Sequence, residues 1–583
     1  MRILFKIFEL IGIMDIPTIF ITFFIFIWFI PFIIITGTNK EKNNRKYILM
    51  SFIPLCVLIV FYLFNYTKGN SSFGILRYMP QIIIACIYVL AGVLPSMKNN
   101  RKPAFVILSV SSVLFTFGSL LYNLGVEGTI HLNNSSHLGY EASISKALDD
   151  LEGYYQLNEY KELDYNSLRE KYISRARTAE QNDDKLEFAK IISELCYEFH
   201  DGHLYYMIND SELDNQLTDE LAGNDYGFSM IELDDGSVVV ILLDDNSEAK
   251  EKGIYNGAVI TKWNGVEIKK ALASASCISP TWPYEDFPCI ENEDTVRAIY
   301  LAGKGEDTIN VSFVTENGNE TTISLNSKGS YAGKLLTATR VFTKRFQEEF
   351  AYTEILDDKI GYIVIPRESY DTYGDTLAYL TDDYPKIKDL FINKIDELRS
   401  QGMEKLIVDL RGNGGGYDAV YEQFVSLFTT EEMVRYGGFC SGNNSFKKSN
   451  NLVFTIEADG RYADIPVVAL VNAGCASSGD LLAYNMSLCP NVTMMGITTS
   501  WGSAQAAGGV CFLSEGTAEI HYPIYPSINE DGTICIDAGK DRKSSLILDV
   551  KIPLTEETVN EIMYSDNDYE LEYAVSYIRE EIQ

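Results

Sequence analysis

Apolar residues are distributed very unevenly along this chain. Four long apolar runs, at about 14–36, 47–66, 78–96 and 103–125, fall near the N-terminus, and no comparable run follows them. Each approaches or exceeds the roughly 20 residues that a helix needs to cross a hydrocarbon core of about 30 Å. Because a cleaved signal peptide would account for only one such run, the pattern predicts four membrane-spanning helices, preceded by an interfacial segment, "MRILFKIFELIG".

Positive charge predicts the orientation of these spans. The loops after the first and third runs carry Lys40, Lys42, Arg45 and Lys46, and Lys98, Arg101 and Lys102, respectively. The loop between them has only Lys68 and Arg77. Since Lys and Arg remain on the cytoplasmic side, everything after Gly125 is predicted to lie outside a cell membrane that the chain crosses several times.

The remainder of the chain is strongly acidic. Residues 1–128 hold 11 of the 48 Lys and Arg residues but only 4 of the 81 Asp and Glu residues, which leaves a net charge of −40 beyond them. Such a domain repels nucleic acid, so none is expected as a partner.

No Cys-x-x-Cys pair or ligand-spaced histidines occur, so neither a metal nor a cofactor is predicted. Cys277 and Cys289 could close a short loop by a disulfide.

Two patterns follow the spans. From about 141 to 200, apolar residues recur at three- and four-residue steps, which predicts a helical segment ended by Gly202. Residues 224–325 alternate short strands with tight turns at Asp235-Gly236 and Asn264-Gly265. This part resembles a PDZ domain, in which Gly227-Phe228 would match the carboxylate-binding loop and a peptide end adds as a strand. A small β-domain without a ligand is the alternative.

Strands alternate with helices from Tyr352 onward. Buried strands are predicted at "KIGYIVI", "KLIVDLRGNGGG" and "IPVVALVNAG", and helices at "YPKIKDLFINKIDELRSQG", "YDAVYEQFVSLF" and "SGDLLAYNMSL". This alternation predicts a parallel sheet, whose ligands lie beyond the carboxyl ends of the strands. Both glycine-containing turns fall at that edge.

Two turns carry candidate chemistry. In "VDLRGNGGG" the glycines leave backbone amides free to hold an oxyanion, whereas no P-loop Gly-Lys-Ser/Thr follows. In "CASSGD" a serine at a helix start gains nearby amides and a favourable dipole. A capping box formed by Ser477 and Asp480 explains the same residues without chemistry, and the local pattern does not distinguish Ser477 from Ser478.

Taken in order, "KIGYIVI", "LIVDLRGNGGG", "VVALVNAGCASSGDLLA" and "ILDVKIPLT" resemble the C-terminal processing (tail-specific) serine peptidases and their tricorn-like branch, over roughly 142–583. The resemblance implies Ser477 as nucleophile and the amides of Ser478 and Gly415 as oxyanion donors. It also implies a ClpP/crotonase-like α/β (α+β) peptidase core with an inserted β-rich PDZ-like domain, beside the α-helical membrane region.

The resemblance also bears on the base. The tail-specific lysine is missing, because no lysine occurs between Ser477 and Lys540. The tricorn-like branch instead takes a histidine from the segment before the PDZ domain, which here is His203 in "DGHLYY". That branch has a serine just before the histidine and a late glutamate, whereas Gly202 stands here and no glutamate aligns. Asp541 is the candidate orienting acid, with Asp201 as an alternative.

These predictions give five parts, with no indication of oligomeric state. The parts are a transmembrane region (1–128), a linker (129–140), a helical part with His203 (141–217), a PDZ-like domain (218–330) and a peptidase core (331–583). The predicted protein is a membrane-anchored, extracytoplasmic serine endopeptidase acting on peptides or proteins. The alternative is a catalytically weak or inactive peptide-binding or sensory ectodomain on a membrane anchor. Trp501 and the glycines of "TTSWGSAQAAGG" are predicted to line the substrate cleft, with a plain loop as the alternative.

Overall fold

A computed structural model describes residues 131–279, 287–289, 293–343, 349–356, 359–369, 385–440, 446–565 and 567–580. The four predicted spans lie outside these ranges. Within them, none of the helices combines the length and apolar character needed to cross a bilayer.

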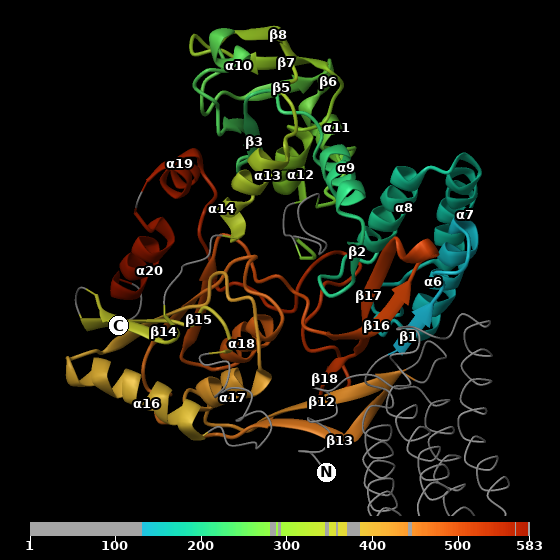
Figure 1. Cartoon of the computed structure of the whole chain (residues 1–583). Coiled ribbons are helices and arrows are strands. Elements are labelled where there is room, and N and C mark those ends of the chain that lie inside the picture. Colours follow the sequence, from blue (N-terminus) through green and yellow to red (C-terminus); the bar gives the residue numbers. More distant parts are fainter. Residues whose placement is uncertain are drawn as a thin grey trace, which may run out of the picture.

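A six-stranded sheet lies in the lower left part of the molecule as drawn in Figure 1. Its strands, in spatial order, are β19 (Val550–Lys551), β15 (Val492–Gly496), β14 (Val467–Leu470), β11 (Lys405–Asp409), β10 (Ile360–Val364) and β9 (Tyr352–Ile355). All neighbours are parallel except the edge pair β9–β10, which confirms the predicted parallel crossovers. Every residue of β10 and β14 is buried, as expected for strands covered on both faces.

Helices cover both faces of this sheet. The three helices on one face are α16 (Pro385–Ser400), α17 (Asp418–Ser426) and α18 (Ser478–Ser487), each at its predicted place. The other face packs against α20 (Tyr569–Glu580), with α19 (Glu556–Tyr564) beside it. The β11-to-α17 and β14-to-α18 turns therefore emerge side by side at the carboxyl edge of adjacent strands.

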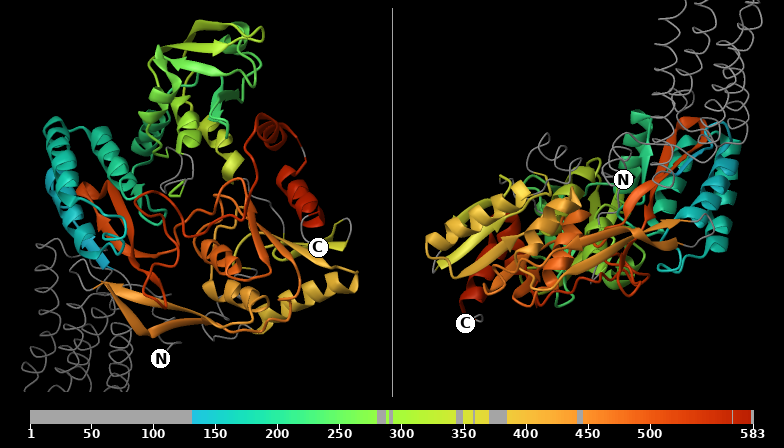
Figure 2. Two further views of the ribbon diagram at one scale, coloured as in Figure 1. Left: turned by 180° about the vertical axis from the view of Figure 1, so that it is seen from behind. Right: turned by 90° about the horizontal axis from the view of Figure 1, so that it is seen from below.

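A second sheet, β1-β16-β17-β2, packs against three helices (Figure 2). Its strands are β1 (His131–Asn134), β16 (Ala506–Phe512), β17 (Ala518–Tyr525) and β2 (Tyr205–Ile208), and its helices are α6 (Tyr140–Tyr154), α7 (Tyr165–Asn182) and α8 (Lys185–Tyr197). The predicted helical segment is therefore interrupted twice. The predicted linker contains β1, which pairs with β16. A third sheet joins β13 (Phe446–Ile456), β12 (Met433–Cys440) and β18 (Ser527–Asn529).

The β-rich unit, residues 224–326, stands out from the rest of the molecule (Figures 1 and 2). It contains β3 (Ser229–Glu232), β4 (Val238–Ile241), α10 (Glu248–Glu251), β5 (Ile260–Trp263), β6 (Val266–Glu267), α11 (Ile268–Ala273), α12 (Glu293–Leu301), β7 (Thr308–Val314) and β8 (Glu320–Asn326). Helices α9 (Ser211–Ala222), α13 (Ala332–Ala338) and α14 (Arg340–Thr343) flank it. Both predicted turns are present, and Asn264 and Gly265 have the positive φ angles of a tight hairpin. Cys277 and Cys289 are both buried, and the suggested disulfide does not join them.

Arg411 ties the glycine turn to the C-terminal part of the chain. Its side chain is fully buried, and its five N–H donors bond to three carboxylates. Asp409 and Asp568 each accept two of these bonds, and Glu570 accepts one at 3.1 Å. Because Gly412 follows directly, the start of the glycine turn is fixed by the segment that leads into α20.

Replacing Arg411 by Met is expected to lower the free energy of unfolding by about 3–5 kcal/mol, because buried carboxylates then lose their counter-charge. The measurement is urea unfolding of the purified full-length chain, followed by near-ultraviolet circular dichroism. Arg461→Met is the matched control. Arg461 pairs with Asp459 but is 42% exposed, so its loss should cost less than about 1 kcal/mol. Equal losses in the two variants would contradict this account.

Candidate active site

Ser477 lies on the sharp turn between β14 and α18. Its φ of 60° and ψ of −122° are unusual for a residue with a side chain. The turn is held by Asp480, whose buried carboxylate accepts the N–H groups of Ser477 (3.1 Å), Gly502 (2.7 Å) and Ser503 (3.1 Å). The backbone strain is therefore stabilised by hydrogen bonds, and the side chain of Ser477 remains partly exposed.

The two adjacent serines have different surroundings. The Ser477 hydroxyl lies 3.2 Å from Nε2 of His203. The Ser478 hydroxyl instead lies within hydrogen-bond distance of two acceptors, the Asp418 carboxylate and the Gly416 carbonyl oxygen, away from the imidazole. The structure thus distinguishes the serines, which the sequence pattern did not. The backbone N–H of Ser478 has no acceptor among the described residues and remains available for an oxyanion.

His203 comes from the loop between α8 and β2, far from Ser477 in sequence. Its ring meets Trp501 edge-on, with centroids 5.4 Å apart. The same Trp501 ring also lies against Gly202. A Cβ at residue 202 would be 2.2 Å from the ring, so a larger residue there would displace Trp501. A serine therefore does not fit in front of His203, which explains the departure from the tricorn-like pattern.

The missing hydroxyl is supplied by Ser503, on the segment that leads to β16. Its buried Oγ lies 3.2 Å from Nδ1 of His203 and donates to Oδ1 of Asp201 at 2.8 Å. Asp201 also accepts the His203 backbone N–H (2.8 Å) and the Tyr155 hydroxyl (2.7 Å). Since the single Ser503 proton goes to Asp201, the Ser503 oxygen must accept from Nδ1–H. The proton then sits on Nδ1, and the Nε2 lone pair faces Ser477.

Burial sets the protonation of the groups beside Ser477. It lowers the pKa of His203 below 6.5, and the charge of Asp201 only partly opposes this shift. At neutral pH the imidazole is therefore neutral, as a base must be. Burial also raises the pKa of Asp480 to about 6, against the backbone N–H groups that it accepts.

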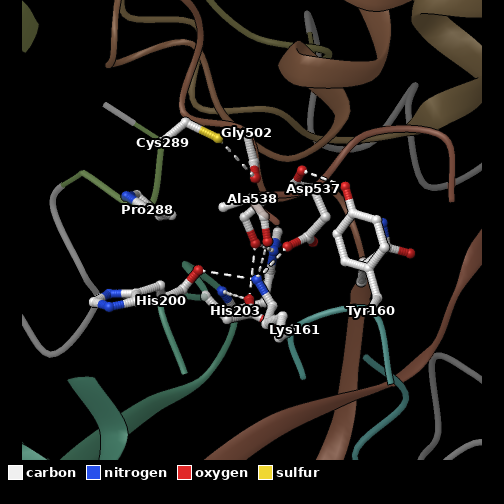
Figure 3. Close-up of polar contacts among 12 residues, drawn as sticks. Tyr160, Lys161, His200, His203, Pro288, Cys289, Gly502, Asp537 and Ala538 are labelled. Carbon is white, nitrogen blue, oxygen red and sulfur yellow. Dashed lines mark hydrogen bonds and ion pairs between the residues drawn. The ribbon is translucent and has the colours of Figure 1, made fainter. Parts of the chain in front are cut away.

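A buried lysine holds the loop that carries His203 (Figure 3). Lys161 Nζ donates to the carbonyl oxygens of His200 (3.0 Å) and Ala538 (2.6 Å) and to Oδ1 of Asp537 (2.7 Å), so all its protons are used. Asp537 lies opposite Ser503 in a backbone bridge. Lys161 therefore connects the loop before His203 with the segment that faces Ser503.

The structure does not bring Asp541 to the imidazole. Asp541 is exposed, and its carboxylate accepts the backbone N–H of Lys543 at 3.2 Å. Asp201, the alternative, reaches His203 through Ser503. Sequence reasoning missed Ser503 and Lys161, because neither belongs to a recognisable spacing. Within the described ranges, no three His, Cys, Asp or Glu side chains gather as metal ligands.

The glycine turn lies against Ser477, but its predicted donor is engaged. The N–H of Gly415 donates to Oδ1 of Asn413 at 2.9 Å, within the turn itself. Of the two predicted oxyanion donors, Ser478 is therefore available and Gly415 is not in this conformation.

This geometry agrees with a match to known sequences. Residues 359–540 match the sequence model of peptidase family S41. The similarity to that family covers residues 359–540 alone. The chain is 30% identical over 164 residues to the carboxy-terminal processing protease CtpA of Bacillus subtilis (strain 168), which covers 27% of this chain and 30% of that protein. The chain thus matches less than a third of the length of this relative.

Solved structures similar to the chain include mature CPAF complexed with lactacystin, at 13% identity over 76% of this chain and 98% of that one, with a TM-score of 0.47. Another is the photosystem II D1 C-terminal processing protease, at 15% identity over 73% and 98%, with a TM-score of 0.33. Ser477 and the glycine turn lie inside the segment that matches the S41 model, whereas His203 lies outside it.

Ser503→Ala is expected to slow fluorophosphonate labelling of Ser477 roughly 10- to 100-fold, which is part of the effect of a positioned base. The reason is that Nδ1 loses its acceptor, so the imidazole loses its fixed tautomer. Asp541→Asn is the control and should change the rate less than about twofold, because Asp541 lies at the surface. The reverse order would assign the orienting role to Asp541.

Proposed function

We propose that this protein is a membrane-anchored, extracytoplasmic serine endopeptidase that hydrolyses peptide bonds through Ser477 and His203. The observation that carries the proposal is the continuous series of hydrogen bonds from Ser477 through His203 and Ser503 to Asp201. The S41 match of residues 359–540 supports the same reaction class. No cofactor is needed.

The geometry supports a two-stage reaction. In the first, Nε2 of His203 takes the Ser477 proton as Oγ attacks the peptide carbonyl carbon, and the N–H of Ser478 stabilises the resulting oxyanion. The protonated imidazole then donates its Nε2 proton to the leaving amine, which leaves an acyl group on Ser477. In the second stage, His203 takes a proton from water, and the hydroxide equivalent attacks the acyl carbon. As that intermediate collapses, the bond between the acyl carbon and Oγ breaks and His203 returns the Nε2 proton to Oγ. The new carboxyl end is released and the serine is restored.

The alternative, a peptide-binding ectodomain without catalysis, accounts less well for these contacts. Binding alone requires neither a strained serine backbone nor a histidine with a defined tautomer. Both features involve buried polar groups, which lower stability unless each partner is in place. Their joint presence at Ser477 and His203 favours hydrolysis.

The β-rich unit is proposed to deliver peptide ends to this site, as the PDZ resemblance suggests. Among the described residues, strand β3 pairs with β4, and α12 packs beside it. Val240 of β4 bonds to Gly257 and Ala258 on its other side, so alternation directs the N–H and C=O of Met230 away from β4. Met230 is fully buried, so an extended peptide end can pair with this edge only after the residues that cover it move aside.

The localisation is proposed from the sequence alone. Four apolar runs precede the described residues. The loops after the first and third runs carry most of the 11 Lys and Arg residues of positions 1–128. This pattern supports a multi-pass anchor in the cell membrane, with the acidic C-terminal part outside and the lipid as a partner. Protease protection of the ectodomain in right-side-out and inverted vesicles tests this topology.

A fluorophosphonate probe is expected to label the purified full-length chain at Ser477. Ser477→Ala should abolish labelling, and His203→Ala should reduce it roughly 10²- to 10⁴-fold, as expected on losing a general base. The readout is in-gel fluorescence followed by mass spectrometry of the labelled peptide.

Ser478→Ala is the matched control, because its hydroxyl points to Asp418 and its backbone N–H is retained. Labelling within about tenfold of wild type is expected. A well-folded wild-type chain that does not label would favour the binding ectodomain instead.

The acid limb of kcat/KM is expected to have its midpoint below pH 6.5. Activity requires neutral His203 and is lost as the pH falls through the His203 pKa, which burial lowers. Because the Asp201 charge raises that pKa, Asp201→Asn should move the midpoint to still lower pH, in addition to slowing the reaction. The substrate is a quenched fluorescent peptide found by screening. A midpoint above 6.5, or a shift to higher pH in the variant, would rule out His203 as the titrating base.

A further inference from the structure

Gly415 is the residue of the glycine turn that lies nearest the nucleophile. A Cβ at Gly415 would lie 2.8 Å from both the Ala476 carbonyl oxygen and Cβ of Ser477, and 3.0 Å from the Ser478 nitrogen. Its backbone is therefore packed beside the N–H of Ser478. The Gly414–Gly415 peptide is thus suitably located to supply a second oxyanion donor.

That donor is occupied. Asn413 accepts the Gly415 N–H through Oδ1 at 2.9 Å. The orientation of the Asn413 amide is fixed, because its Nδ2 donates to the Ile365 carbonyl oxygen (2.9 Å) and to Oε1 of Glu368 (2.8 Å). With both amide protons used on that side, the amide oxygen must face the turn.

Glu368 holds the Asn413 amide in this orientation by accepting one of its protons. Its side chain is fully buried, its backbone N–H and C=O bond to Gly415 and Tyr417, and Oε2 has no partner among the described residues. The nearby charges that act on it are those of Asp418 and Asp480, both negative. Burial, together with these charges, raises the pKa of Glu368 to about 8.

We propose that the structure holds a resting state of the peptidase, in which Asn413 withholds the Gly415 N–H and Glu368 keeps Asn413 in place. The catalytic state is reached by rotation of the Gly414–Gly415 peptide, which turns this N–H toward the oxyanion beside Ser478. Asn413 is then a restraining residue and Glu368 a positioning residue. The inference rests on the proposed function, because it concerns the oxyanion of the same reaction.

The local backbone permits such a rotation. Rotation of the Gly414–Gly415 peptide changes ψ of Gly414 and φ of Gly415. Gly414 is exposed, Gly415 has a φ of 88°, and neither residue has a Cβ to restrict these angles. Ser477 and His203 are already within hydrogen-bond distance of each other, so only the oxyanion site is incomplete. A bound substrate carbonyl must therefore compete with one amide oxygen for one N–H.

Removing the restraint should accelerate the reaction. In the full-length chain, Asn413→Ala is expected to raise the second-order rate of fluorophosphonate labelling about fivefold, the factor for one net hydrogen bond. The probe places its P=O oxygen where the oxyanion forms, so the rate reports the availability of Gly415. The double variant Asn413→Ala/Glu368→Gln removes the unpaired buried carboxyl and should show the same gain if the single variant folds poorly.

The outcomes separate this inference from the function beneath it. Labelling of wild type at Ser477, with an unchanged or slower rate in the folded Asn413 variants, overturns the resting state but leaves the peptidase proposal intact. Failure of wild type to label overturns both.

Glu368→Gln supplies a second readout, which a merely structural role would not change. Ionised Glu368 holds the Asn413 amide more tightly than neutral Glu368, because charge-assisted hydrogen bonds are stronger. Wild-type labelling is therefore expected to slow above pH 8, whereas Glu368→Gln, which keeps Oε1 and cannot ionise, should not slow there. If the labelling rate fell equally above pH 8 in wild type and in Glu368→Gln, Glu368 would have no part in restraining Asn413.

Discussion

A hydroxyl group has one proton to donate, and at Ser503 a buried carboxylate receives it. The remaining properties of the site depend on this constraint. Because Ser503 has no second proton, it can only accept from His203, and the imidazole must carry its own proton on Nδ1. The basic nitrogen then faces Ser477 without a charged residue touching the ring. The carboxylate of Asp201 holds the Ser503 hydroxyl in place, and Tyr155 in turn donates to that carboxylate. The imidazole is therefore oriented by hydrogen bonds and by burial together.

The parallel sheet brings the reacting groups together across large sequence separations. Strands β11 and β14 are neighbours, so the turns that leave their carboxyl ends lie against each other. One turn carries the glycines and the other carries Ser477. The second sheet contributes the base from the loop that leads into β2 and the acceptor hydroxyl from the segment that leads into β16. The site thus lies where two sheets meet, and neither sheet alone contains a complete set of groups.

Periodicity predicted the central layer well. Strands β10, β11 and β14 and helices α16, α17 and α18 occur where apolar runs and glycine turns indicated, because a parallel sheet buried on both faces requires continuous apolar strands. Strands β12 and β13, which lie between them in sequence, were not predicted. The resemblance also directed attention to Ser477 and His203, which the structure brings within 3.2 Å.

The orienting group could not be found in this way. Ser503 follows Trp501 in a segment with no regular pattern, and its role arises only because the Trp501 ring excludes a side chain at residue 202. Asp541 was inferred because it lies near the place of the late glutamate in the tricorn-like pattern, but its carboxylate lies on an exposed turn. The Asn413–Gly415 bond was equally inaccessible, since a glycine run indicates freedom of the backbone but not which way an amide points.

Arg411 has a consequence for the order in which the chain matures. Its partners Asp568 and Glu570 follow it by 157 and 159 residues, and they are synthesised after every other part of the site. Until they arrive, the guanidinium has no buried counter-charge beyond Asp409, and the glycine turn lacks its anchor. A nascent chain therefore carries Ser477 and His203 before the glycine turn is anchored. The ion cluster that stabilises the finished protein is thus also the last part of the site that can form.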